Sequence, residues 1–243
     1  QHGRRRRVPL TGCAGSGGGR GGQVVDRGAS HRRRGEVLLD PLLDGGGAGV
    51  THPAAAHAAG AEYLGAPPPG SPSHRWIGQA NLSFPTEPTG GSWGEFYATY
   101  RIAPYLDAPA FDHDDRRIMD KLCSTLASGA LDHDQPELVR RDGVAARIHG
   151  DMWSGNIMWT PDGATLIDPA AQGGHAEEDL ASLSVFGAPF TERIRAAYDE
   201  ESPLAPGWQE RIELHQVHML VMHCAVFGRS YVGPTVSIAR RWA

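Results

Sequence analysis

Three side chains near the middle of the chain have the types and the spacing that phosphoryl transfer requires. Asp151 stands five residues before Asn156, and Asp168 follows at the end of a later predicted strand. An enzyme that moves the γ-phosphoryl group of ATP needs a carboxylate beside the attacking hydroxyl and oxygen ligands for Mg²⁺. The pattern therefore predicts Asp151 as the catalytic carboxylate, and Asn156 and Asp168 as the residues that bind Mg²⁺ and, through it, the phosphates of ATP.

The residues just before Asp151 are better explained by the shape of the loop than by further catalysis. His149 and Gly150 directly precede the acid, and we interpret them as loop-shaping residues, with His149 supporting the loop rather than acting as a base. The four fixed positions of His-Gly-Asp and Asn156 match by chance in roughly one of several hundred chains of this length. Asp168-Pro169 at a strand end lowers that frequency further.

Three predicted strands position these side chains. Residues 144–148 read as a strand that enters the loop, 157–160 as a second strand and 164–168 as a third. Pro161-Asp162-Gly163 between the last two is typical of a tight hairpin turn. Asp151 and Asn156 then lie on a loop that leads into a hairpin, and Asp168 ends the returning strand, so two acids and an amide can converge.

Predicted helices surround this small β region. Ser92 and Glu95 form a capping-box pattern for a helix that should stop near Pro104. Apolar spacing, glycines and prolines predict further helices at 54–59, 112–128, 136–141, 177–186, 191–200 and 208–227. The expected fold class is therefore α+β, mainly helical, with a short β-hairpin at the catalytic loop. His215, His218 and His223 on the last helix invite a metal interpretation, but their spacing favours ordinary core or surface histidines.

Residues 1–50 differ in composition from the remainder. They hold nine arginines and four acids, about +5, whereas the remaining fourteen basic and twenty-four acidic residues give 51–243 about −10. The segment is rich in glycine and lacks aromatic residues, so it cannot offset the entropy of ordering itself. We expect a low-complexity, mostly disordered segment at 1–50 and one domain at 51–243. The Gly17 to Val24 match to a kinase glycine-rich loop is attributed to chance.

Charge and cysteine content limit the partners and the compartment. The arginine clusters have no interleaved aromatics, which favours a solvated basic tail over a nucleic-acid-binding arm. No run of about 18 apolar residues suggests a membrane span, and no secretory signal is apparent. Three cysteines without CxxC spacing suit a reducing compartment. We expect a cytoplasmic protein without nucleic-acid or membrane partners. The sequence carries no pattern from which an oligomeric state could be predicted.

Longer motifs in the chain resemble those of the fructosamine kinase family, also called ketosamine-3-kinases, within the aminoglycoside-phosphotransferase-like branch of the kinase fold. The matching stretches are His149-Gly150-Asp151-Met152-Trp153-Ser154-Gly155-Asn156, Ile167-Asp168-Pro169-Ala170, Gly174-His175-x-Glu177-x-Asp179-Leu180-Ala181 and Phe186-Gly187. The resemblance extends over about residues 52–240. The Trp-Ser-Gly after the acid favours this family over choline kinases and aminoglycoside kinases.

The resemblance implies a protein-kinase-like C-terminal lobe that uses ATP and Mg²⁺ to phosphorylate the sugar 3-hydroxyl of a ketosamine, free or on a protein. The phosphorylated adduct is unstable, so the activity repairs glycated amines. Trp153 is implied either as a face on which the sugar stacks or as packing under the loop, with equal weight. Asp179 is expected to hydrogen-bond the backbone of the catalytic loop from the start of its helix.

One departure from the family pattern leaves alternatives open. Family members have an N-terminal nucleotide lobe whose strand lysine grips the ATP phosphates, whereas the only lysine here is Lys121, in a predicted helix of the C-terminal lobe. One hypothesis is that residues 1–50 are an out-of-frame or mis-started translation. The alternatives to a ketosamine kinase are a catalytically impaired remnant that acts as a binding module, and a kinase for another small-molecule hydroxyl such as an aminoglycoside or choline.

Overall fold

The computed structural model describes residues 37–39, 53–71, 75–88, 92–160 and 163–243. The chain divides into two units, Gln1–Arg32 and Arg33–Ala243, and all the described residues belong to the second. Apart from strand β1 (Val37–Leu39), the segment 1–50 with its expected disorder and its glycine-rich motif lies outside the described residues. The domain division at residue 50 therefore stays a prediction.

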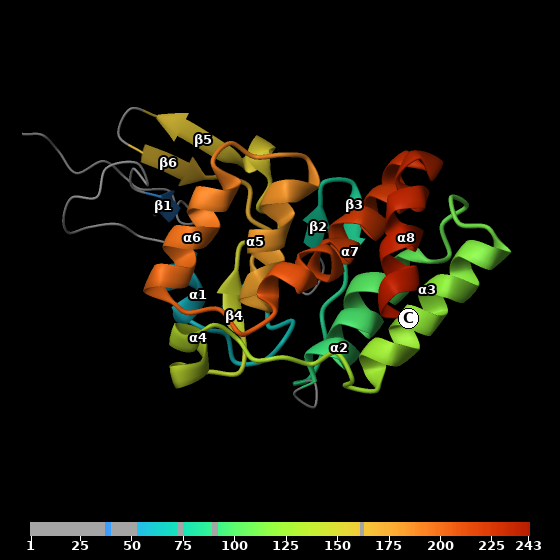
Figure 1. Cartoon of the computed structure of the whole chain (residues 1–243), viewed down its shortest axis with the longest axis horizontal. Helices are drawn as coiled ribbons and strands as arrows, with labels where there is room; N and C mark the ends of the chain where they lie inside the picture. Colours follow the sequence, from blue (N-terminus) through green and yellow to red (C-terminus); the bar gives the residue numbers. More distant parts are fainter. Residues whose placement is uncertain (1–36, 40–52, 72–74, 89–91, 161–162) are drawn as a thin grey trace, which may run out of the picture. The chain divides into compact units, whose positions relative to one another are not determined.

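Short antiparallel strands form three small sheets in the described part of the chain (Figure 1). The largest has the order β1–β6–β5, in which β5 (Ile157–Thr160) and β6 (Gly163–Leu166) pair with Thr160 opposite Gly163. The other two sheets pair β2 (Arg75–Ile77) with β3 (Ala80–Leu82), and β4 (Ala146–Ile148) with β7 (Gln172–Gly174). The predicted hairpin after the catalytic loop is confirmed, although its turn residues Pro161 and Asp162 lie outside the described residues.

Helices make up most of the described unit. They are α1 (Pro53–Ala58), α2 (Trp93–Phe96), α3 (His113–Ala127), α4 (Glu137–Asp142), α5 (Ala176–Val185), α6 (Thr191–Glu201), α7 (Trp208–Phe227) and α8 (Val232–Trp242). Six predicted helices are confirmed to within one residue at each end. Together with the small sheets they confirm the α+β class. Helix α8 was not predicted, because Gly233 and Pro234 interrupt its sequence; Pro234 is tolerated since it lies in the first turn, where no donor is needed.

The helix predicted to start after Ser92 and to stop near Pro104 is confirmed in extent, but only its first turn is α-helical. Ser92 Oγ accepts the Glu95 N–H (3.1 Å), as the capping pattern predicts. After Phe96 the chain forms a π-helical segment, Tyr97–Ile102, and then a 3₁₀ turn, Ala103–Tyr105. Pro104 has no N–H for the Tyr100 carbonyl, which instead accepts a hydrogen bond from Arg101 Nη1 (2.9 Å). The fully buried Arg101 also bonds Ser83 O and the Gln172 side chain, joining this helix to β7.

Two apolar cores support the loop between β4 and β5. The first lies among α2, α3, α7 and α8, and the second beneath the loop, where Ile148, Met152, Leu166 and Leu180 are all at most 4% exposed. Helix α5 packs against α7 and so connects the two. Among the described residues, none of the helices has the length and apolar character needed to cross a lipid bilayer.

Candidate active site

The loop after β4 folds back so that Asn156 contacts Asp151. A single 3₁₀ turn, Ser154–Asn156, reverses the chain between them. Asn156 Nδ2 donates to the Asp151 carboxylate oxygen Oδ2 and to its main-chain oxygen, both at 2.9 Å. These bonds fix the orientation of the carboxylate and use only the NH₂ group of Asn156. The amide oxygen of Asn156, which takes no part in them, is the atom that the sequence predicts as a metal ligand.

Asp168 lies just beyond β6 with its side chain exposed. Its φ of 51° places a non-glycine residue in the left-handed region, a sparsely populated conformation that clusters at functional sites. Its negative charge is close enough to Asp151 to contribute to the raised pKa of that carboxyl. The structure therefore brings the three predicted side chains into one neighbourhood.

The environment of Asp151 favours its protonated form. Burial raises the pKa of Asp151 to about 7, and the charges of Asp179 and Asp168 act in the same direction, while the hydrogen bond from Asn156 opposes them. A carboxylate with a pKa near neutral pH can accept a proton from a hydroxyl more readily than an ordinary one. The electrostatics of the loop thus suit the accepting role predicted for Asp151.

Asp179, near the start of α5, holds the backbone of this loop. Its two carboxylate oxygens accept the N–H groups of His149 (2.7 Å) and Gly150 (2.9 Å). Burial opposes the charge of Asp179, but the hydrogen bond and charge of His57 and the nearby His149 outweigh it and lower the pKa of Asp179. The loop is therefore fixed from α5 by a buried, ionised side chain.

His149 joins the two halves of the site through its ring. The Asp151 N–H donates to His149 Nδ1 (3.2 Å), so the opposite nitrogen, Nε2, carries the hydrogen that Ile167 O accepts at 3.0 Å. Burial lowers the pKa of His149, which keeps the ring neutral. The ring thus connects the residue before Asp168 to the loop that carries Asp151, and both of its nitrogens are occupied.

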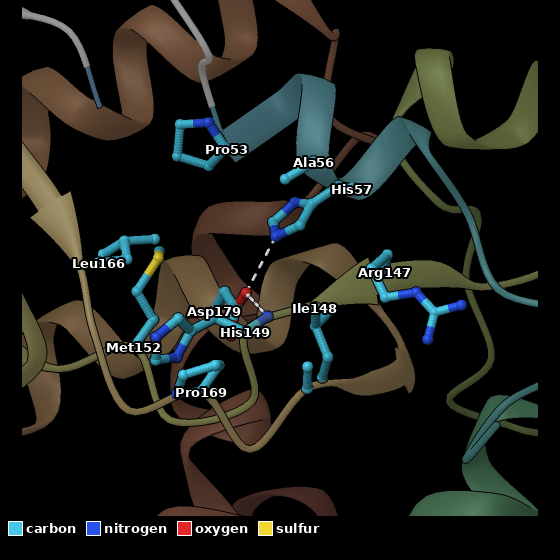
Figure 2. A pocket seen from close by; sticks show the side chains of 11 residues that line it. Pro53, Ala56, His57, Arg147, Ile148, His149, Met152, Leu166, Pro169 and Asp179 are labelled. Atoms are coloured by element: carbon cyan, nitrogen blue, oxygen red, sulfur yellow. Dashed lines mark hydrogen bonds and ion pairs between the residues drawn. The ribbon is translucent and has the colours of Figure 1, made fainter. Parts of the chain in front are cut away.

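His57 is a contributor that the sequence did not reveal. From α1 it places Nε2 3.0 Å from Asp179 Oδ2 (Figure 2), and its Nδ1 lies 2.9 Å from the Tyr198 hydroxyl. It lines a largely apolar pocket of about 150 Å³ with Ile148, Met152 and Leu166, behind the catalytic loop. A histidine in an alanine-rich helix 122 residues from its partner carries no local signal that could have predicted this contact.

A second pocket, of about 160 Å³, includes Asp151 in its wall. It is lined by Asp151 and Trp153 from the loop, by Ile77 to Gln79 from the β2–β3 turn, and by Met222, His223, Val226 and Phe227 from α7. Trp153 is partly buried, and its ring meets Phe186 edge-on at 5.6 Å. The ring therefore packs against Phe186 and lines the pocket, while its stacking against a sugar stays a prediction. We take this pocket, rather than the one behind the loop, as the candidate substrate site because it includes Asp151.

The donor set around the loop fits a hard divalent cation. Asn156 offers an amide oxygen and Asp168 an exposed carboxylate, and oxygen ligands of these types suit Mg²⁺. Lys121, in contrast, lies exposed on α3, which Figure 1 shows far from the β5–β6 hairpin. The one lysine of the chain is therefore remote from the candidate metal ligands.

Comparisons with known proteins agree with the geometry. A family model described as fructosamine kinase matches residues 75–242. The chain is 34% identical over 150 residues to ketosamine-3-kinase of Mus musculus, which covers 61% of this chain and 46% of the mouse protein. A solved structure from Thermobifida fusca, provisionally named a fructosamine-3-kinase, is 43% identical with a TM-score of 0.65 and covers 77% of this chain and 61% of that one. The chain thus spans about half of the length of the mouse relative.

Proposed function

Because this chain belongs to the fructosamine kinase family, we propose that it transfers the γ-phosphoryl group of ATP to a sugar hydroxyl of a ketosamine, such as a fructosamine or a ribulosamine. The observation that carries the proposal is the Asp151 carboxylate, held by Asn156 at the pocket that Trp153 lines. Phosphoryl transfer depends mainly on positioning and charge stabilisation, which such a rigid loop provides.

Each residue has a defined part in the proposed reaction. Asp151 accepts the hydrogen of the sugar hydroxyl and orients its oxygen. Asn156 and Asp168 would hold Mg²⁺, which neutralises charge on the phosphates of bound ATP. Trp153 offers a flat apolar face to the sugar, and Asp179 and His149 keep the loop in place.

The proposed product is a phosphorylated ketosamine on a free amine or on a protein. As its phosphorylated sugar is unstable and leaves the amine, the reaction would reverse glycation. We also propose a cytoplasmic location, supported by the unpaired Cys123 and Cys224 in the described part of the chain.

The test is Mg²⁺-dependent transfer of phosphate from ATP to fructosyl-lysine and ribulosyl-lysine. Asp151→Asn should lower kcat by about 10²- to 10⁴-fold, the usual contribution of a positioned base. Asp114→Asn is the matched control, because this carboxylate is exposed on α3 and should leave kcat unchanged. Full transfer by Asp151→Asn would disprove the role of the carboxylate. Preferential transfer to choline or an aminoglycoside would replace the proposed acceptor.

The position of Lys121 favours a second candidate, a binding module that holds a ketosamine without transferring phosphate. In this case the pocket at Trp153 would bind the sugar, but no lysine would reach the nucleotide phosphates. Isothermal titration calorimetry distinguishes the two candidates. A binding module should bind a ketosamine with the same affinity with and without Mg²⁺ and ATP, and should never phosphorylate it.

A further inference from the structure

A second group of potential metal ligands lies outside the pocket that Asp151 lines. His133 from the segment before α4, Glu177 from α5 and His215 from α7 converge in the interior, and His175 completes the group. One ligand atom from each of the four residues lies within 4.8 Å of the others. The spacing of the histidines along α7 did not indicate this group, because only His215 of that helix takes part.

The distances among three of these residues match those of a metal site. His133 Nε2 lies 2.9 Å from His215 Nε2 and 3.7 Å from Glu177 Oε2, and His215 Nε2 lies 3.3 Å from the same oxygen. Tetrahedral Zn²⁺, with bonds of about 2.0–2.1 Å, separates its ligand atoms by roughly 3.3 Å. The three observed distances between potential ligand atoms lie on both sides of this value.

Hydrogen bonding leaves the lone pair of His133 Nε2 facing two other potential ligand atoms. Since a carbonyl oxygen only accepts, the bond between His133 Nδ1 and Leu131 O (2.8 Å) puts the hydrogen on Nδ1 and a lone pair on Nε2. That lone pair points at His215 Nε2 and at a carboxylate oxygen. One proton can bridge only two of these three atoms well, whereas a cation at their centre satisfies all three.

The surroundings hold the three side chains in place. A metal-bound histidine usually donates its other N–H to a carbonyl or carboxylate, as His133 does here. Arg211 orients Glu177 through two hydrogen bonds (2.7 and 3.1 Å), and Trp93 packs its ring against His133 and His215. His175 keeps both nitrogens bonded to backbone groups, Nδ1 to Glu177 N and Nε2 to Asp134 O, so it frames the group and does not ligate.

We propose that His133, Glu177 and His215 supply three ligands of a tetrahedral site for a transition-metal ion of the zinc class, with water as the fourth ligand. Two imidazoles with one carboxylate suit Zn²⁺ or Co²⁺, whereas Mg²⁺ prefers an all-oxygen set, so the two metals would not compete. A bound ion would join α7 and the segment before α4 to the start of α5. Glu177 precedes Asp179 by two residues, so the ion would also steady the helix that supports the catalytic loop.

The test measures metal content and stability rather than catalysis. The full chain without an affinity tag is stripped with a chelator, incubated with ZnCl₂, desalted and analysed by mass spectrometry for zinc. Wild type should hold about one zinc per chain and melt higher by about 5 °C or more than the stripped protein, even in excess Mg²⁺. His133→Ala should lose most of the zinc and of the shift in Tm, because His133 supplies one of three ligands.

Two control variants separate this site from other binding. His113→Ala removes an exposed histidine on α3, and Asp168→Asn alters the proposed magnesium site, so both should keep about one zinc per chain. Equal zinc content in wild type and His133→Ala would overturn the proposal. If His133→Ala does not fold, as judged by circular dichroism, Co²⁺ added to stripped wild type decides: intense visible bands of a tetrahedral ion support the site, and their absence rejects it.

Discussion

At the scale of single residues, the catalytic loop combines a carboxyl that resists ionisation with one that is firmly ionised. Burial raises the pKa of Asp151 to about 7, whereas hydrogen bonds lower that of Asp179 although it is more deeply buried. The difference arises from the donors. The Asp179 carboxylate accepts hydrogen bonds from two backbone N–H groups and from His57. Among the described residues, the side chain that donates to the Asp151 carboxylate is that of Asn156. Removing the charge of Asp151 and removing that of Asp179 should therefore change the stability of the protein in opposite directions.

Asp151→Asn should stabilise the protein while it lowers activity. The folded pKa of about 7 exceeds the ordinary 3.8, so the stability contribution of Asp151 falls as the pH rises through this interval. Replacing it with asparagine removes that cost, by about 1–2 kcal/mol at pH 8 once solvent screening of a partly exposed group is allowed for. Urea denaturation at pH 8 and at pH 5 should show a larger gain at pH 8. An equal gain at both values would contradict the raised pKa.

Asp179→Asn should destabilise the protein. The carboxylate accepts hydrogen bonds on both oxygens, and an amide would turn its NH₂ group toward one of the buried donors. We expect a loss of about 2–4 kcal/mol in the free energy of unfolding at neutral pH. Since the folded pKa is lowered, the contribution of Asp179 is present above the ordinary carboxyl pKa and disappears as the pH falls through the lower folded value.

Urea denaturation of Asp179→Asn at pH 7 measures this loss. Asp120→Asn, an exposed carboxylate on α3, serves as the control and should change stability by less than about 0.5 kcal/mol. If the two variants were equally stable, the hydrogen bonds from the loop to α5 would not hold the loop in solution.

At the scale of elements, the conformation of the loop between β4 and β5 requires a glycine at position 150. Gly150 has a φ of 77°, and a Cβ atom there would lie 2.5 Å from the Ala170 carbonyl oxygen, in the segment between Asp168 and β7. A side chain at this position would therefore push the Asp151 loop and the Asp168 segment apart. The glycine allows the two segments that carry Asp151 and Asp168 to approach one another.

Gly150→Ala should accordingly lower both stability and activity. The left-handed backbone and the contact with Ala170 O together predict a loss of about 2–4 kcal/mol in the free energy of unfolding and a 10-fold or larger fall in kcat. Gly233→Ala is a matched control of opposite sign. Gly233 lies in α8 with open space around it, so alanine there should stabilise the helix by about 0.5–1 kcal/mol. Similar thermal shifts for both variants would show that the Gly150 backbone is not constrained.

The sequence predicted long helices better than the contacts between elements. Helix α7 has the predicted ends because Gly207 and Gly228 bound a long apolar run, and the β5–β6 hairpin follows from its turn residues. The strand predicted at 144–148 is found as β4, whereas strands β2, β3 and β7, with three residues each, are too short for a periodic pattern to predict. The approach of Asp151, Asn156 and Asp168 could be predicted because a single hairpin connects them. His57 and the group around His215 could not, since only tertiary packing brings α1, α5 and α7 together.

At the scale of the whole molecule, the distribution of charge sets the conditions under which the proposed nucleotide binding could occur. Residues 51–243 carry a formal charge of about −10, and Asp151 and Asp168 add negative charge where phosphates would bind. ATP is itself an anion, so its binding beside these acids must depend on a divalent cation. No lysine lies near the loop between β4 and β5 to offset this negative charge, because the one lysine of the chain, Lys121, lies on α3.

ATP should therefore raise the Tm only when Mg²⁺ is present, and Asp168→Asn should abolish that increase because it removes the charged ligand. Lys121→Met should keep the full increase, since Lys121 is exposed on a helix remote from Asp168. Differential scanning fluorimetry of the three proteins, with and without Mg²⁺, measures both effects. If Lys121→Met lost the increase while Asp168→Asn kept it, the nucleotide would bind near α3, and the metal ligands assigned at the β5–β6 hairpin would be wrong.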